Sequence, residues 1–195
     1  MTSQHSTDLP PSALDVAEYI LERSGAQGPK KLQKLVYYCQ VWSIVWRGGP
    51  LFHEEIQAWV HGPVVSELYQ MHAHQDRVLA VGGHSDRITQ EQGDVIDEVL
   101  RYYSHLDGRT LSQLTHDEDP WKAARGDLPE NHPSTNRISQ ESIRNYYTRR
   151  PCGGGHPVTC FDSVSLKNAE ISRRQLQSGQ YIEYPGRGLE HACNS

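Results

Sequence analysis

Residues 29–46 read PKKLQKLVYYCQVWSIVW, and apolar side chains recur along this stretch at the spacing of one helix face. A proline fits the first turn of a helix, where its missing N–H is not needed, so we expect the helix to begin at Pro29. Gly48, Gly49 and Pro50 follow and end it. The spacing predicts a core-facing stripe made of Leu32, Leu35, Val36, Cys39, Trp42 and Trp46.

Aromatic side chains crowd this predicted helix, because Tyr37, Tyr38, Trp42 and Trp46 cannot all point to the same side. Two interpretations stay open. Either the helix is packed on both sides in the core, or some of these rings form an exposed contact face, since Trp and Tyr are enriched at protein interfaces. The apolar part, Leu35–Trp46, is interrupted by Gln40 and Ser43 and is too short to span a bilayer.

Helices are also predicted on both sides of this stretch. Before it, Ser12 and Asp15 mark the start of a helix that ends near Gly25. After it, the Thr89–Gln92 capping box introduces a helix whose inward positions are Val95, Ile96, Val99, Leu100 and Tyr103. Shorter helices are expected over Val64–His74, from Thr110, from Trp121 with Asp119 as its cap, and from Ser139 with Ile143, Tyr146 and Tyr147.

The hydrophobic period changes to two over Ile56–His61, which predicts a short strand. A second strand is expected at Arg77–Val81, paired with the first. The sequence therefore predicts a mainly α fold: a compact multi-helix single domain with a small antiparallel β element.

The composition changes near Pro151. All four tryptophans precede this proline, whereas Gly153–Gly155 and mostly polar residues follow it. Such a segment has too little apolar surface to build its own core. We therefore expect a flexible N-terminus at residues 1–11, a helical domain at 12–150 and a poorly structured Gly-rich and polar extension at 151–195.

The net charge is −5, and acidic and basic residues are interspersed without a basic stripe, which argues against nucleic acid as the main partner. Met1–Pro11 lacks the layout of a signal peptide and no segment suits a membrane span, so we predict a cytoplasmic protein. Cys39 is expected in the core, and Cys152, Cys160 and Cys193 do not suggest a secreted disulfide framework.

Candidate catalytic and metal-binding groups are few. His116–Asp119 reads HDED, which offers a general base or metal ligands, but acids before a helix start are more simply capping and solvated residues. The tail carries Cys152, His156 and Cys160, then His191 and Cys193, at a spacing that matches no common zinc site. We predict no catalytic residue, no cofactor and no metal.

Several motifs resemble, in order, the Panacea domain of SocA-like antitoxins. The resemblance runs from about Ser12 to Tyr147 and is carried by Ala13–Leu21, Lys31–Tyr38, Pro50–Phe52, Glu54–Val65, Leu68–Tyr69, Leu111–His116, Pro120–Trp121, Ile138 and Ile143–Tyr147. It implies an antitoxin that neutralises a cognate protein toxin by direct binding, often encoded on a prophage or another mobile element. An alternative within the family is an adaptor that delivers the toxin to an ATP-dependent protease.

The resemblance supplies no catalytic residues. We expect Lys34, Tyr38 and His61 to be exposed and to contact the partner. Gly62-Pro63 is predicted to form a fixed turn, and Trp59 and Trp121 to anchor the core. Two further alternatives remain: an enzyme that reverses a toxin's modification through His116, and a DNA-binding autoregulator.

Overall fold

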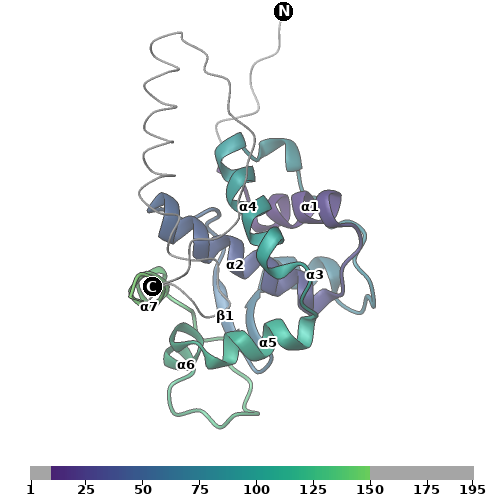
Figure 1. Cartoon of the computed structure of the whole chain (residues 1–195). Coiled ribbons are helices and arrows are strands. Elements are labelled where there is room, and N and C mark those ends of the chain that lie inside the picture. Colours follow the sequence, from purple (N-terminus) through teal and green to yellow (C-terminus); the bar gives the residue numbers. More distant parts are fainter. Residues whose placement is uncertain (1–9, 150–195) are drawn as a thin grey trace, which may run out of the picture. The chain divides into compact units, whose positions relative to one another are not determined.

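A computed structural model describes residues 10–149, and these residues are mainly helical, as the sequence predicts. Figure 1 shows the arrangement of the elements. The helices and strands are α1 (Ala13–Ser24), α2 (Pro29–Arg47), β1 (Ile56–Trp59), β2 (Gly62–Val65), α3 (Ser66–His72), the 3-10 turn η1 (Ser85–Arg87), α4 (Gln90–Tyr103), α5 (Gly108–Asp117), α6 (Asp119–Arg125) and α7 (Gln140–Tyr147).

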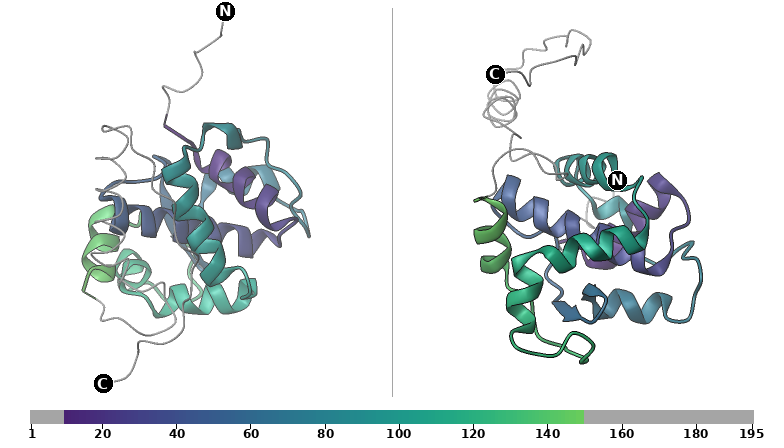
Figure 2. Two further views of the ribbon diagram at one scale, coloured as in Figure 1. Left: turned by 45° about the horizontal axis from the view of Figure 1, so that its top comes forward. Right: turned by 60° about the horizontal axis from the view of Figure 1, so that its bottom comes forward.

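Helix α2 lies in the middle of this body, where it contacts α1, α3, α4, α5, α7 and β2 (Figures 1 and 2). Tyr37, Tyr38 and Trp42 are all buried, and Trp46 is half-buried. Of the two interpretations of the aromatic residues, the helix packed on both sides is therefore correct. Cys39 is buried in the same helix, and burial raises the pKa of its thiol.

The helix starts follow the predicted caps closely. Ser12 with Asp15, and Thr89 with Gln92, form complete capping boxes, and the Ser139 hydroxyl accepts from the backbone N–H of Ser142. Two starts differ from expectation. Helix α5 begins at Gly108, because the Asp107 carboxylate accepts from the Thr110 N–H at 2.7 Å, and α6 has Glu118 as its N-cap residue.

The sheet is a tight hairpin in which Ile56 pairs with Val65 and Trp59 with Gly62. The predicted second strand at Arg77–Val81 was wrong, since Val78 makes just an isolated bridge with Gln27. The strand that pairs with β1 comes directly after the two-residue turn at Val60 and His61. Helix α3 consequently starts at Ser66 and not at Val64.

Both outer edges of this small sheet are hydrogen bonded. On the β1 side, the Ala58 N–H donates to Asn136 O and the Ile138 N–H donates to Ile56 O, each at 2.8 Å. On the β2 side, Pro63 has no N–H to satisfy, and its carbonyl accepts from Lys34 Nζ at 2.7 Å. Gln33 bonds both backbone groups of Val65. Side chains of α2 therefore fix the position of β2.

Some predictions lie outside the described residues. They are the order of the tail at 151–195, the flexibility of residues 1–9 of the N-terminus, and any zinc site at Cys152, His156, Cys160, His191 and Cys193. Within residues 10–149, none of the helices has the length and apolar character needed to cross a membrane.

Candidate functional site

The three predicted partner contacts are not equally accessible. His61 is exposed at the tip of the hairpin, as expected. The expected exposure of Lys34 and Tyr38 was wrong, because Lys34 is 1% exposed and Tyr38 is fully buried. Both lie on α2, which neighbouring elements surround, so neither presents a surface to a partner.

Lys34 is a buried lysine without a carboxylate partner among residues 10–149. Its Nζ donates to Pro63 O, and no Asp or Glu lies within ion-pair distance of it among residues 10–149. Burial, with a smaller contribution from the Lys30 charge, lowers the pKa of Lys34 to about 7. A methyl group on Gly62 would lie 2.6 Å from Thr115 Oγ1 and 2.8 Å from Lys34 Cε, so these three residues form one tightly fitted contact.

Gln33, the neighbour of Lys34, is a second buried polar residue with a structural role. Its amide nitrogen donates to Val65 O at 3.2 Å, and its amide oxygen accepts from the Val65 N–H at 2.9 Å. The same nitrogen lies 3.0 Å from Nε2 of the buried His72 on α3. The Gln33-Lys34 pair therefore joins α2 to β2 and α3.

Glu118 is the centre of a buried cluster of tyrosines. The carboxylate is 1% exposed and accepts from Tyr38 Oη at 2.9 Å and from Tyr37 Oη at 3.4 Å. Tyr38 stacks on Tyr103 of α4, with 4.1 Å between ring centroids. Burial, and after it the Glu118 charge, raises the pKa of Tyr37, Tyr38 and Tyr147. The cluster links α2, α4, α6 and α7.

The interpretation of the HDED stretch as solvated was therefore wrong for Glu118, although Asp117 at the end of α5 and Asp119 at the start of α6 are exposed as expected. The sequence carried a signal for this cluster. Tyr37, Tyr38, Tyr103 and Tyr147 all lie on predicted helices, with Tyr103 at an inward position, and buried tyrosine hydroxyls need a hydrogen-bonding partner. An acid between two helices is the group that can provide it.

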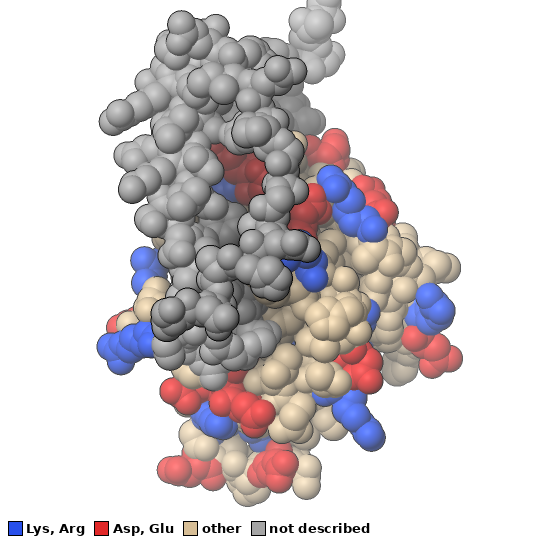
Figure 3. All heavy atoms as spheres, in the orientation of Figure 1, with Lys and Arg blue, Asp and Glu red and all other residues tan. Residues whose placement is uncertain are grey.

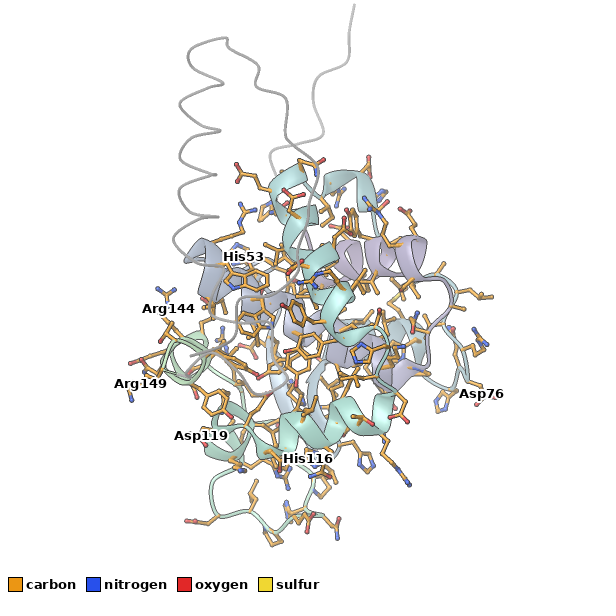
Figure 4. The ribbon with its side chains drawn as sticks, in the orientation of Figure 1. His53, Asp76, His116, Asp119, Arg144 and Arg149 are labelled. Carbon is orange, nitrogen blue, oxygen red and sulfur yellow. The ribbon has the colours of Figure 1, made fainter. Side chains whose placement is uncertain are left out.

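His116 does not join Glu118 in a catalytic arrangement. Its ring stacks on Trp121 with 4.2 Å between centroids, at the junction of α5 and α6 (Figure 4), whereas the Glu118 carboxylate contacts tyrosines in the core. Burial, then the charges of Lys34 and His61, lower the pKa of His116. No three His, Cys, Asp or Glu side chains gather in a metal-binding arrangement among residues 10–149.

An aromatic surface lies on the outward side of the hairpin. Gln57 and Trp59 share one face of β1, and Trp59 Nε1 donates to Gln57 Oε1 at 2.8 Å. Tyr69 of α3 meets the Trp59 ring edge-on, with 4.9 Å between centroids, and is 39% exposed. Trp59 is thus half-buried, unlike Trp121, which anchors the core and donates to Trp59 O at 2.9 Å. We call Gln57, Trp59 and Tyr69 the aromatic surface.

The tyrosine cluster yields a stability prediction. We expect Glu118→Gln to lower the free energy of unfolding by about 2 kcal/mol, because the two tyrosine hydroxyls bond different carboxylate oxygens and a neutral amide offers one weaker acceptor in their place. Asp117→Asn at the exposed neighbour is the control and should change it by less than about 0.5 kcal/mol. Urea denaturation measures both. Equal effects would show that the Glu118 carboxylate is not a structural acceptor.

Comparison with known proteins agrees with the resemblance. The family model described as "Antitoxin SocA-like, Panacea domain" matches residues 32–122, which include Gln33, Lys34, the hairpin, Thr115 and Glu118. No curated protein and no solved structure matches the chain. Residues 32–122 of this chain are therefore similar to the Panacea domain of SocA-like antitoxins.

Proposed function

We propose that this protein is a cytoplasmic antitoxin that neutralises a protein toxin by binding it directly, without catalysis. The match to the SocA-like antitoxin family supports a role in a toxin–antitoxin pair. The HDED stretch, the best catalytic candidate, has its acids directed to different places, with Glu118 in the core and Asp117 in solvent. That arrangement favours binding over chemistry.

The observation that carries direct binding is the aromatic surface. Trp and Tyr dominate the binding energy of many interfaces, because they bury a large area at a small entropic cost. Trp59 and Tyr69 are in contact with each other and reach solvent, so a partner can cover both rings at once. A stable complex of this kind buries about 1,600 Å² in total, of which these rings would form the centre.

Co-expression tests the proposal. The gene adjacent to this one is induced alone and together with a tagged copy of this protein, and growth, toxin level and co-purification are recorded. Rescue of growth with a stable complex supports direct neutralisation. Rescue with loss of the toxin and no complex would indicate delivery to an ATP-dependent protease. Absence of both toxicity and rescue would refute the antitoxin role.

A point substitution tests the aromatic surface itself. We expect Tyr69→Ala to weaken the complex about 30-fold, the effect of removing an interface anchor worth roughly 2 kcal/mol. Leu79→Ala is the control, since Leu79 is apolar and 77% exposed but lies on the loop between α3 and η1. The affinity of the Leu79→Ala variant for the toxin should change less than about two-fold. Isothermal titration calorimetry measures both, and equal affinities would exclude the aromatic surface as the interface.

A further inference from the structure

Basic side chains gather around the hairpin tip, and no carboxylate among residues 10–149 pairs with them. Lys30 in the first turn of α2 and His61 at the tip are exposed, with Lys34 buried beneath them and His116 on α5 beside them. We call these four residues the hairpin-tip cluster. Among residues 10–149, none of them is within ion-pair distance of a carboxylate.

Three elements bring the cluster together. Gly108, at the start of α5, fits against the start of α2 so closely that a methyl group there would lie 3.4 Å from Lys30 Cβ. One turn later, Ser112 Oγ donates to His61 O at 2.7 Å, which holds the hairpin tip against α5. Beneath the tip, Lys34 Nζ would lie 3.0 Å from a methyl group on Gly62. Packing therefore fixes the buried Lys34 and the backbone positions that carry Lys30 and His61.

The field inside the cluster is positive. Burial, followed by the charges of Lys30 and Lys34, lowers the pKa of His61. At His116 the Lys34 and His61 charges, which lower the pKa, exceed the opposing effects of Glu130 and Asp117. At the start of α5, Asp107 caps the helix and lies near the exposed Arg109.

One nitrogen of the cluster has no partner in the described part of the chain. His116 Nε2 is buried and makes no hydrogen bond there, although its ring is fixed by stacking on Trp121. An unsatisfied buried nitrogen is costly unless another group completes its hydrogen bonding.

We infer that the hairpin-tip cluster receives an acidic segment of the partner protein, with a carboxylate seated near Lys30, His61 and His116. This inference rests on the proposed antitoxin function and names the chemistry of the partner's surface. His61 of the cluster is two residues from Trp59 in the same hairpin. One partner can therefore cover the aromatic surface and place a carboxylate at the hairpin tip. Nucleic acid fits less well, because the chain carries a net charge of −5 and acidic side chains are interspersed with basic ones on the face in Figure 3.

Binding of an acid has a proton signature. Burial, followed by the neighbouring charges, lowers the pKa of His61 and His116 and favours their neutral forms at pH 7, and a carboxylate beside them would favour the protonated forms. Complex formation should then take up protons at pH 7. The charged groups that act on this equilibrium are Lys30, Lys34, Glu130 and Asp117.

The test compares charge reversal inside and outside the cluster. Lys30→Glu should weaken binding of the co-expressed toxin at least ten-fold, whereas Arg77→Glu, at an exposed arginine beyond α3, should change it less than two-fold. Calorimetry in buffers of different ionisation enthalpy should show proton uptake that decreases in His61→Gln. Thermal melting confirms that each variant is folded. If both reversals weaken binding equally, or proton uptake is absent, the inference is overturned while the antitoxin complex stands.

A second arm is independent of the toxin. An eight-residue glutamate peptide and a twelve-nucleotide single-stranded DNA are titrated into the free protein. Peptide binding that Lys30→Glu removes supports the cluster as an acid-binding site even where no toxin complex forms. Tighter binding of the DNA, with the same sensitivity to Lys30→Glu, would overturn the inference in favour of nucleic acid. The inference would also be overturned if neither probe binds and Lys30→Glu leaves the affinity for the toxin unchanged.

Discussion

Gly62→Ala is expected to destabilise this protein severely. Gly62 has a φ of +97°, where a side chain costs about 1–3 kcal/mol of backbone strain. The added methyl group would also lie 2.6 Å from Thr115 Oγ1 and 2.8 Å from Lys34 Cε, neither of which has free space to move into, because both residues are buried. Overpacking adds about 1–3 kcal/mol. We therefore expect a loss of roughly 4 kcal/mol in the free energy of unfolding.

Gly48→Ala separates the two causes. Gly48 also has a positive φ, of +77°, but nothing lies within 4 Å of a methyl group placed there. Its substitution should cost about 1 kcal/mol, from the backbone alone. Chemical denaturation of the two variants measures the difference. If Gly62→Ala costs no more than Gly48→Ala, the contact between the hairpin, Lys34 and Thr115 is not a tight one.

The second large effect is a dependence of stability on pH that comes from Lys34. Its pKa in the folded protein is about 7, below the ordinary value of 10.5. Between these values the unfolded chain binds more protons than the folded one, so stability rises with pH and is lost as pH falls towards 7. The slope from this one group is at most about 1.4 kcal/mol per pH unit. We expect the free energy of unfolding to rise by about 1 kcal/mol or more between pH 7 and 8.5.

Lys34→Met is the matched control for this profile, since methionine is unbranched, is one atom shorter than lysine and has no titrating group. The variant leaves Pro63 O without its donor, so its absolute stability is not the readout. The readout is the difference in slope between the two proteins. The pH range stops at 8.5 because of other buried groups. The pKa values of Cys39, Tyr37, Tyr38 and Tyr147 are raised in the folded protein. At higher pH these groups ionise in the unfolded chain first, which lowers the stability of the folded protein. If the free energy of unfolding has the same pH dependence in both proteins, Lys34 remains charged when buried.

Most of the helices could be predicted because their signals are local. The Ser12 and Thr89 capping boxes and the Pro29 start are fixed by residues three or four positions apart, and the structure has them as predicted. The strands depend on pairing instead. An alternating pattern at Ile56–Trp59 identifies one strand, but Gly62-Pro63 resembles a turn, so Gly62–Val65 could not be recognised as its partner from local preference.

The site was less predictable than the fold, for a related reason. A lysine on a helix and an acid beside a helix start are usually solvated, and that expectation failed for Lys34 and Glu118. Both are buried by elements distant in sequence: Pro63 accepts from Lys34, and Tyr38 donates to Glu118 from 80 positions away. His61 was predicted correctly to be exposed, because a residue at a turn is exposed whatever the tertiary contacts are.

The hydrogen bonding at the two outer edges of the hairpin restricts how any partner can bind. Many peptides are recognised by adding a strand to a free sheet edge, where backbone groups pair and sequence matters little. Here the backbone at 136–138 occupies the β1 side, and Gln33 and Lys34 occupy the β2 side. A partner of this hairpin must therefore recognise side chains. Substitution of a few exposed residues can then change which partner binds, while Gln33, Lys34 and Gly62 hold the hairpin in the same position.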